Sequence, residues 1–504
     1  MPTVMLGAKL LTSDEVFAVA REGARVELAP EALERVQAAR ALIQQIVDED
    51  RVVYGVTTGF GHLSRVHIGH EQLADLQRNL LRSHASGVGE PLAEDVTRAM
   101  LLLLANSLAR GHSGARVEVI ETLLALLNAH VQPLIPSRGS VGASGDLAPL
   151  AHLGLALISE GEAIYEGRRL PGADALRLAG IAPLELQPKE GLALINGTHL
   201  MEAMGLLAVR DAEALLGAAE VAAAMSVEAL MGSFVPFDAR IHALRPQPGQ
   251  AAVAARMRDL LVGSEINPAH KDCPRVQDPY TLRCIPQVLG AVRDALAYCS
   301  SVFERELGAV TDNPLLFPED AVSLSGGNFH GQPLALALDM LAIGVAQLAG
   351  FSERRTYSLL GPHDWDEHGA PLFLTPNPGL NSGYMIPQYV AAALVNEIKL
   401  LAHPASIDSI PTSAGMEDWN SMGATAAHKA RQAIQLAARV VAIELLLAAQ
   451  MLEFRKPLKP GRGVLAAYEQ VRALVPALAA DRPPAPDIER LAGAVLAGQW
   501  RGAA

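Results

Sequence analysis

Apolar residues recur at helical spacing along most of this chain. Five stretches are long enough for helices well beyond the usual length of about 11 residues, and they span 199–232, 284–307, 331–359, 385–403 and 424–455. Shorter amphipathic stretches predict further helices within 13–50, from 76 to about His84, over 94–110 and over 115–129. Ser13, with the two acidic residues after it, is typical of a helix start. This pattern predicts a mainly α protein with a central bundle of long helices.

Polar, glycine-containing loops interrupt the helical pattern repeatedly. They lie at 54–62, 83–89, 139–146, 195–198, 277–287, 325–333 and 412–423. Binding and catalytic residues concentrate in loops that a rigid scaffold holds in place. We therefore look for a functional site in these loops.

Composition narrows the class of protein. Of the 504 residues, 50% are hydrophobic and only 4% aromatic, and the helix formers Ala and Leu dominate. A chain of this length predicts more than one domain. The formal net charge of −13, without a basic block, argues against nucleic acid and anionic membranes as partners.

The number of cysteines and the placement of charged residues indicate the cellular compartment of the protein. The three cysteines are Cys273, Cys284 and Cys299. So few cysteines, in an odd number, favour a reducing environment over a disulfide scaffold. Charged residues such as Arg210, Asp211 and Glu444 interrupt the apolar runs, so no stretch is typical of a transmembrane helix. The N-terminal residues lack the apolar core of a signal peptide, and we expect a soluble cytoplasmic protein.

The loop GSVGASGD (139–146) carries unusual chemistry. A glycine nitrogen is the least hindered backbone nucleophile, so in a tight turn the nitrogen of Gly145 can attack the carbonyl carbon of Ala143. Loss of water, with dehydration of Ser144, leaves a five-membered ring with an exocyclic methylene. That methylene is a carbon electrophile, which ordinary side chains do not supply. The alternative is an ordinary helix cap, in which Ser144 or Asp146 satisfies free N–H groups of the following helix.

Eight segments, in the same order, resemble the ammonia-lyase and aminomutase family that builds a methylidene-imidazolone (MIO) from Ala-Ser-Gly. They are YGVTTGFG (54–61), SHASGVGE (83–90), GSVGASGDLAPLAHL (139–153), EGLALINGT (190–198), QDPYTLRCIPQV (277–288), GGNFHG (326–331), LNSGYMIPQ (380–388) and HPASIDSIPTSAGMEDWNSMG (403–423). The resemblance covers nearly the whole chain. It implies that Ala143, Ser144 and Gly145 form the MIO autocatalytically. It also implies a fumarase-like all-α architecture, with an MIO-bearing domain at 1–200 and a helical bundle at 201–504.

The resemblance assigns roles to three further residues near the electrophile. Tyr54 matches the family's catalytic base, which removes the β-proton of the substrate. Tyr280 matches an active-site tyrosine that assists proton transfer or orients the electrophile. Asn196 matches the donor to the ring's carbonyl oxygen, where negative charge builds when a nucleophile adds. Without the resemblance, the sequence favours a buried loop anchor for Tyr54, and Asn196 begins a common Asn-Gly turn.

Three other residues match positions that hold the substrate or the ring. Arg283 can bind the substrate carboxylate through two parallel hydrogen bonds. Gln277 matches a position that supports the ring or the carboxylate, and Phe329 matches a residue packed by the ring. The ordinary alternatives are a surface ion pair for Arg283 and core packing for Phe329.

Two residues bear on the substrate. His84 lies where the family reads the substrate's ring, and a polar side chain there fits tyrosine or histidine rather than phenylalanine. Glu417 stands where the histidine-specific members carry Glu, and a carboxylate accepts a hydrogen bond from an imidazole N–H. We expect elimination of ammonia from L-histidine to give trans-urocanate. Alternatives are a tyrosine ammonia-lyase, a 2,3-aminomutase acting on histidine or tyrosine, a lyase of thio-histidine betaine, and a structural Glu417 paired at a helix start.

Three residues depart from the pattern of the histidine-specific members. Met416 replaces a usual Gln, Trp419 replaces a usual His, and Pro387 stands where a small residue is common. The pocket wall is therefore atypical, which leaves a histidine analogue open as substrate.

Neither a metal nor a nucleotide is expected as a cofactor. The histidines of the Tyr54 loop, at 62, 67 and 70, lack a carboxylate frame and a helical HExxH pattern. The segment GFG is too short for a nucleotide-binding loop. The resemblance implies a small amino acid as substrate and a homotetramer whose active sites combine residues from three chains.

Overall fold

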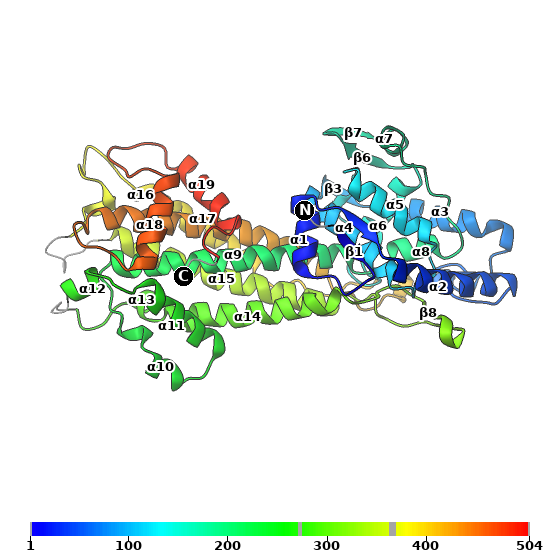
Figure 1. The fold of residues 1–504 in the computed structure, drawn as a ribbon, viewed down its shortest axis with the longest axis horizontal. Helices are drawn as coiled ribbons and strands as arrows, with labels where there is room; N and C mark the ends of the chain where they lie inside the picture. The colour runs from blue at the N-terminus through cyan, green and yellow to red at the C-terminus, as the bar shows by residue number, and fades with distance from the viewer. Residues whose placement is uncertain (1–2, 271–274, 362–368, 502–504) are drawn as a thin grey trace. The chain divides into compact units, whose positions relative to one another are not determined.

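The computed structural model describes residues 3–270, 275–361 and 369–501. Over these residues the chain forms nineteen α-helices and nine short strands (Figure 1), which confirms the predicted mainly α class. The chain divides into two compact units. The first unit comprises Met1–Leu207, Ser300–Leu338 and Ala405–His428. The second unit comprises Ala208–Cys299, Asp339–Pro404 and Lys429–Ala504.

Eight helices lie wholly in the N-terminal part of the first unit. They are α1 (Ser13–Glu22), α2 (Pro30–Asp48), α3 (Leu73–His84), α4 (Glu94–Ala109), α5 (Val117–Asn128), α6 (Leu147–Leu157), α7 (Gly172–Ala179) and α8 (Glu190–Ile195). Helix α4, nearly all of it buried, packs against α1, α2 and α5. Helices α3, α6 and α8 pack against one another, and the loops that end them carry several of the predicted site residues.

The first helix begins one residue earlier than its sequence pattern indicates. Its N-cap is Thr12 rather than Ser13: the Thr12 hydroxyl accepts the backbone N–H of Glu15 at 3.3 Å. The Glu15 carboxylate in turn accepts the backbone N–H of Thr12 at 3.0 Å, which completes a capping box. The predicted helical region 13–50 is also divided, because strand β2 (Val26–Leu28) separates α1 from α2.

The strands are short and form four small sheets. Strand β1 (Val4–Leu6) pairs in parallel with β2, and β3 (Val88–Pro91) pairs antiparallel with β5 (Pro136–Arg138). Strands β4 (Gln132–Pro133), β6 (Glu162–Tyr165) and β7 (Arg168–Pro171) form an antiparallel sheet in that order. Strands β8 (Leu315–Phe317) and β9 (Val322–Leu324) form a hairpin. The helical spacing of the sequence did not predict these strands, which are mostly three or four residues long.

The five long helices predicted from the sequence are present. They are α9 (His199–Ala229), α14 (Ile285–Glu306), α15 (Gln332–Leu360), α16 (Met385–Leu401) and α17 (Gly423–Glu453). Each boundary lies within three residues of the prediction, because apolar periodicity is strong over such lengths.

An ion pair in the core of the second unit joins three of these helices. Glu444 of α17 and Arg355 of α15 are fully buried, and the guanidinium donates two hydrogen bonds to the carboxylate at 2.5 and 2.8 Å. Ser226 of α9 and Ser352 of α15 donate to the same carboxylate at 2.7 and 2.6 Å. The negative charge of Glu444, which interrupts the apolar run of α17, is therefore neutralised by Arg355 inside the helical core.

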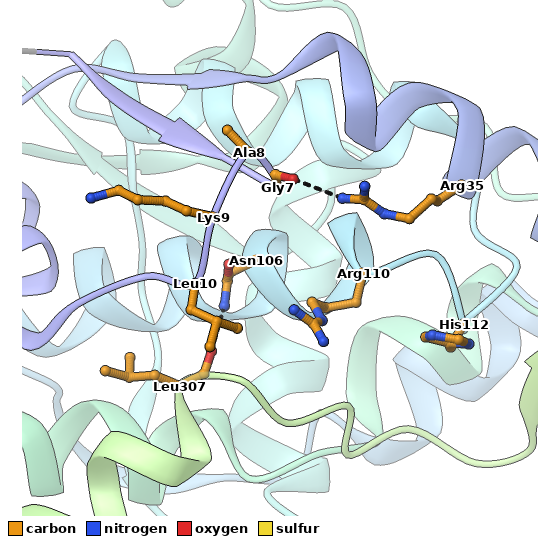
Figure 2. A pocket seen from close by; sticks show the side chains of 9 residues that line it. All are labelled: Gly7, Ala8, Lys9, Leu10, Arg35, Asn106, Arg110, His112 and Leu307. Atoms are coloured by element: carbon orange, nitrogen blue, oxygen red, sulfur yellow. Dashed lines mark hydrogen bonds between the residues drawn. The ribbon is translucent and has the colours of Figure 1, made fainter.

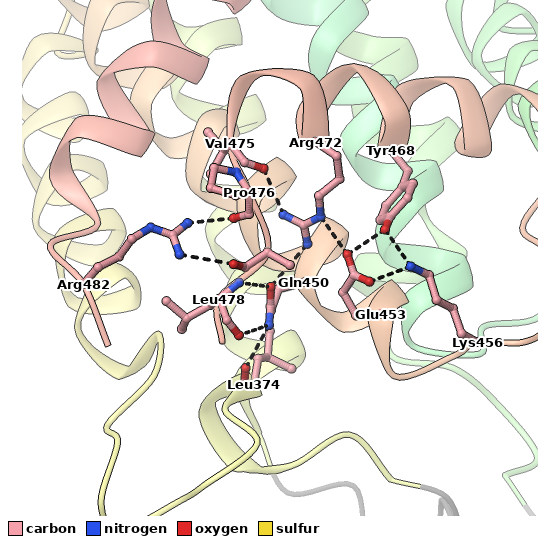
Figure 3. Close-up of polar contacts among 11 residues, drawn as sticks. Leu374, Gln450, Glu453, Lys456, Tyr468, Arg472, Val475, Pro476, Leu478 and Arg482 are labelled. Carbon is pink, nitrogen blue, oxygen red and sulfur yellow. Dashed lines mark hydrogen bonds and ion pairs between the residues drawn. The ribbon is translucent and has the colours of Figure 1, made fainter. Parts of the chain in front are cut away.

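Six shorter helices complete the nineteen of the described chain. They are α10 (Ala239–Ala243), α11 (Pro248–Leu260), α12 (Ile266–Ala269), α13 (Tyr280–Arg283), α18 (Arg462–Leu474) and α19 (Ala485–Leu496). Figure 3 shows how polar contacts tie α18 and the segment after it to the end of α17. Glu453 accepts from the Tyr468 hydroxyl at 2.6 Å and from Arg472 at 2.8 Å, and the Gln450 amide donates to the carbonyl oxygen of Leu478 at 3.1 Å.

Within the described ranges, two helices are long and apolar enough to cross a membrane by length and composition, α15 and α17. The most apolar window of α17 is 83% buried inside the protein, as in the core helix of a folded domain. Cys284 and Cys299 form no disulfide within the part of the chain that the structure describes, and Cys273 lies outside the described residues.

Candidate active site

The Ala143-Ser144-Gly145 segment lies just before α6 and pairs with the Asn196-Gly197 turn that follows α8. Gly145 and Gly197 form an isolated parallel bridge, and the backbone N–H of Asp146 donates to the carbonyl oxygen of Gly197 at 2.8 Å. A Cβ atom on Gly145 would lie 2.1 Å from that oxygen, and the φ angle of Gly145 is 75°. Only glycine fits at this position, because any side chain would collide with the backbone of the turn.

Asp146 locks this loop to α9. Its carboxylate accepts the backbone N–H groups of Leu200 and Met201 at 2.9 and 3.0 Å, and the Ser140 hydroxyl at 2.7 Å. The helix-cap alternative considered from the sequence is therefore wrong in one respect. Asp146 caps the first turn of α9 rather than the following helix α6, to which its side chain makes no capping bond. Burial raises the pKa of Asp146 to about 6.

Two further segments of the first unit hold the loop from other sides. The Ser421 hydroxyl donates to the carbonyl oxygen of Gly142 at 2.8 Å, and the Met422 N–H donates to that of Val141 at 2.9 Å. The backbone N–H of Gly331, two residues after Phe329, also donates to the Gly142 carbonyl oxygen, at 3.1 Å. Phe329 is half-buried, and this bond holds its loop beside the Ala-Ser-Gly segment.

Glu417 lies directly against Ser144. The Ser144 hydroxyl donates to one carboxylate oxygen of Glu417 at 2.5 Å, and the Thr412 hydroxyl donates to the other at 2.7 Å. Among the described residues Glu417 has no ion-pair partner, so the ion pair at a helix start that the sequence left open is not formed. A carboxylate is thus held next to the side chain that the sequence marks as the source of an electrophile.

His84 is the last residue of α3 and faces the same carboxylate. Its Nδ1 lies 2.9 Å from the carbonyl oxygen of Leu80, which can only accept, so Nδ1 carries the proton and Nε2 is left as an acceptor. Burial lowers the pKa of His84, while the Leu80 carbonyl and the negative charge of Glu417 act in the opposite direction. His84 and Glu417 together offer a ligand one neutral and one negatively charged hydrogen-bond acceptor.

The Tyr54 loop reaches the same region. The Tyr54 hydroxyl oxygen accepts the backbone N–H of Gly61 at 3.2 Å, and such a donor stabilises negative charge on the oxygen. The short helix η1 (Gly61–Leu63) contacts η6 (Ser413–Gly415), which directly follows Thr412. The loop of Tyr54 is thereby packed against the segment that carries Glu417.

Asn196 is buried at the end of α8, beside the paired Gly145 and Gly197. Its side-chain oxygen has no hydrogen-bond partner among the described residues. A buried amide without a partner for one of its atoms is unusual, because such an atom carries an uncompensated desolvation cost. It is consistent with a group reserved for a ligand or for a ring formed at 143–145.

The remaining predicted residues belong to the second unit. Tyr280 and Arg283 are the two ends of α13, and the Arg283 guanidinium carbon lies 4.7 Å from the centroid of the Tyr280 ring. Tyr280 is 69% exposed, Gln277 is exposed, and the Nε atom of Arg283 is buried without a partner among the described residues. Asp278, which accepts the backbone N–H of Ser233 at 2.7 Å, anchors this segment.

The structure therefore brings eight predicted residues into the first unit: Tyr54, His84, Ala143, Ser144, Gly145, Asn196, Phe329 and Glu417. Sequence reasoning missed two supporting residues, Asp146 and Thr412. Both belong to segments that resemble the family. Asp146 follows Ser144 closely in the sequence and Thr412 precedes Glu417 closely, and this proximity was the signal that could have indicated their roles. Met416 and Trp419, which depart from the family pattern, are 59% and 62% exposed within the single chain and flank Glu417 without covering it.

The fold and the candidate site together indicate the protein family to which this chain belongs. Residues 11–473 match the family described as aromatic amino acid lyase, and the chain belongs to that family. The chain is 56% identical to a protein of Deinococcus radiodurans named histidine ammonia-lyase, over 97% of this chain and 93% of that protein. The crystal structure of histidine ammonia-lyase from Trypanosoma cruzi superimposes with a TM-score of 0.91 at 42% identity, over 99% of this chain and 94% of that one. Tyrosine aminomutase from Streptomyces globisporus is also similar, with a TM-score of 0.93 at 39% identity over 99% and 98% of the two chains.

Proposed function

We propose that this protein is a histidine ammonia-lyase, a carbon–nitrogen lyase that eliminates ammonia from L-histidine to give trans-urocanate. The observation that carries the proposal is the 2.5 Å contact between Ser144 and Glu417, with His84 facing the same carboxylate. A carboxylate at this place suits an imidazole N–H, whereas facing an uncharged benzene ring it would be a poorly paired charge. The names of the relatives at 51–56% identity support the same reading.

The residues at 143–145 fit the MIO group. Gly145 has no room for a Cβ atom, and the buried oxygen of Asn196 lacks a partner among the described residues, so its amide is free to turn toward a ring carbonyl. When formed, the MIO would supply a carbon electrophile that activates the substrate for loss of ammonia. Asp146 accepts two hydrogen bonds from α9 and one from Ser140 of its own loop, and it thereby holds the tripeptide in one conformation.

The other side chains then have separate tasks. Tyr54 removes the β-proton through its oxygen, which must be deprotonated before the transfer and becomes neutral in it. The backbone N–H of Gly61 stabilises the charged form of that oxygen. Glu417 and His84 orient the imidazole, and Phe329 packs beside the reacting centre. Arg283 binds the substrate carboxylate, with Gln277 in support and Tyr280 assisting proton transfer.

We further propose a homotetramer with shared active sites. The support is the exposed apolar surface of two helices: Leu336, Met340 and Ile343 lie on one face of α15, and Ile386, Tyr389, Val390 and Leu400 are exposed on α16. Apolar faces of this extent mark interaction surfaces. The exposed Tyr280 and Gln277 are then available to a neighbouring chain's site.

Two organisational proposals accompany this function. We place the MIO-bearing domain at 1–200 and the bundle at 201–504, and we place the enzyme in the cytoplasm as a soluble protein. Charged residues within the apolar runs and the burial of α17 support the second proposal.

An aminomutase is the second candidate, because the tyrosine aminomutase of S. globisporus has a TM-score of 0.93, against 0.91 for the histidine ammonia-lyase of T. cruzi. A mutase returns the ammonia to the β-carbon of the same skeleton, so no net ammonia is released. Glu417 is the feature that favours histidine over tyrosine in either reaction.

The test is a parallel assay of the purified protein on L-histidine, L-tyrosine and L-phenylalanine, with near-ultraviolet absorbance and free ammonia measured together. Urocanate and ammonia in equal amounts from histidine alone are expected. Coumarate from tyrosine, or a β-amino acid without free ammonia, would refute the proposal. Mass spectrometry of the peptide containing Ser144 should show the loss of two waters, and Ser144→Ala should abolish both that loss and turnover.

A further inference from the structure

A cavity rich in positive charge lies in the first unit (Figure 2), and none of the residues proposed for catalysis lines it. Its volume is about 340 Å³, and Arg35, Arg110, Lys9 and His112 contribute to its lining. None of the described residues that line it is acidic. Its size is within the usual range for small-molecule sites, roughly 300–1,000 Å³. Such a concentration of cations is unexpected in a chain with a net charge of −13.

Arg110 is the central cation of this cavity. It directly follows α4 and is half-buried, yet its guanidinium has no hydrogen-bond or ion-pair partner among the described residues. Figure 2 shows the guanidinium between Asn106 and His112. The amide of Asn106 is already committed to the carbonyl oxygen of Leu307, at 2.9 Å. The C-terminus of α4 favours a positive charge at this position, but it leaves the five N–H donors of the guanidinium unused.

The second cation is held in place by close backbone packing. Arg35 of α2 donates to the carbonyl oxygen of Gly7 at 2.8 Å (Figure 2). A Cβ atom on Gly7 would lie 2.5 Å from that of Ala32, and one on Gly111 would lie 2.7 Å from that of Arg35. The two glycines let the chain before α1 and the chain after α4 approach α2 closely. The close packing fixes the backbone at Arg35 and at Gly111, the residue after Arg110, and the Gly7 carbonyl oxygen holds the Arg35 guanidinium.

The other two basic groups contribute less charge. Lys9 pairs with Glu15 at 3.0 Å, which offsets its charge. His112 uses Nδ1 to donate to the carbonyl oxygen of Leu316 at 2.9 Å, and its Nε2 remains for a ligand. The excess positive charge of the cavity therefore comes from Arg35 and Arg110.

We infer that this cavity binds a small organic anion, with a phosphate or carboxylate group held by Arg110 and Arg35. Guanidinium groups recognise both oxyanions through parallel hydrogen bonds. The aliphatic side chains of Leu10 and Leu307 border the cavity and suit the carbon part of such a ligand. The ligand would join the chain before α1 to the end of α4 and to the residue after α14. This inference is independent of the proposed function.

The test is isothermal titration of the full-length enzyme with sodium phosphate, glycerol 3-phosphate and citrate, at constant ionic strength set with chloride. We expect saturable binding that Arg110→Gln weakens about tenfold or more, because it removes a charged donor from the anion. Arg168→Gln is the matched control: it removes the same charge from the β6–β7 sheet, outside the cavity, and should leave the affinity within about twofold. Tighter binding of glycerol 3-phosphate or of citrate identifies the phosphate or the carboxylate as the preferred group.

A second variant separates this cavity from the proposed active site. Arg283→Gln should bind the anions like the unchanged enzyme, while Arg110→Gln should retain its turnover of L-histidine. Absence of saturable binding, equal binding by Arg110→Gln and Arg168→Gln, or loss of binding in Arg283→Gln alone would each overturn the inference. Circular dichroism of Arg110→Gln checks that its helices are intact, and Arg110→Lys, which keeps the charge, should recover part of the affinity.

Discussion

Replacing Glu417 by Gln tests the substrate assignment most directly. The change keeps the size of the side chain and its hydrogen bond from Thr412, which is 2.7 Å in the structure. It removes the negative charge beside Ser144, the residue from which the electrophile forms. The substrate's imidazole must lie near this position if Glu417 reads it.

The magnitude follows from the kind of hydrogen bond that is lost. A bond between an N–H and a carboxylate contributes about 1.5–3 kcal/mol, whereas a bond between neutral partners contributes about 0.5–1.5 kcal/mol. If the imidazole binds as a cation, the loss is larger, up to about 4 kcal/mol for charges about 4 Å apart at an effective dielectric constant of about 20. We expect kcat/KM for L-histidine to fall between about tenfold and about a thousandfold.

The assay is the initial rate of near-ultraviolet absorbance on L-histidine and L-tyrosine, for the unchanged enzyme, Glu417→Gln and the control Glu166→Gln. Glu166 is exposed on the turn between β6 and β7, and its variant should behave like the unchanged enzyme. Mass spectrometry must first show the loss of two waters at Ser144 in every protein, so that a missing electrophile is not mistaken for a missing contact. An unchanged kcat/KM for L-histidine in Glu417→Gln, with the electrophile present, would refute our reading of Glu417.

Three other changes test separate parts of the structure. Tyr54→Phe should lower kcat for L-histidine by about 100-fold or more with KM within about threefold, because it removes a proton acceptor and not a binding group; an unchanged kcat would exclude Tyr54 as the base. Arg355→Met should destabilise the protein by about 3–5 kcal/mol, because Glu444 is left buried without its cation. Arg355→Met combined with Glu444→Leu should recover most of the thermal midpoint, and no recovery would contradict the ion-pair argument. Glu228, whose pKa burial raises from 4.5 to about 7, holds its proton more tightly in the folded state. Its contribution to stability is therefore full below about pH 4.5 and is lost as the pH rises through about 7, a change of about 3 kcal/mol. In Glu228→Gln the fall in thermal midpoint between pH 5 and 8 should be smaller than in the unchanged enzyme, and parallel pH profiles would count against this assignment.

The helical part of the fold was largely predictable from the sequence. The boundaries of α9, α14, α15, α16 and α17 follow from apolar periodicity, which is a local property of each segment. The short strands were not predictable in the same way. A pair such as β1 and β2 is formed by three residues in each segment, and its stability depends on the helices packed around it.

The candidate site was predictable as a set of residues but not as an arrangement. Asp146 looked like a cap for the helix that follows it, yet it caps α9, more than fifty positions later in the chain. Sequence reasoning considered only the nearest helix, because capping patterns are defined by residues within one turn. Which helix end comes within reach of a carboxylate is decided by packing.

The sequence by itself determined the local features: where helices form, which tripeptide can cyclise, and which residue types stand in each loop. Only the tertiary structure decided which of these features meet. Ser144 and Glu417 are separated by 273 positions in the chain and 2.5 Å in space, and Arg35 and Arg110 come together on either side of one cavity. Periodicity and turn chemistry act over a few residues, whereas contacts between distant segments depend on how the buried faces of whole helices fit together.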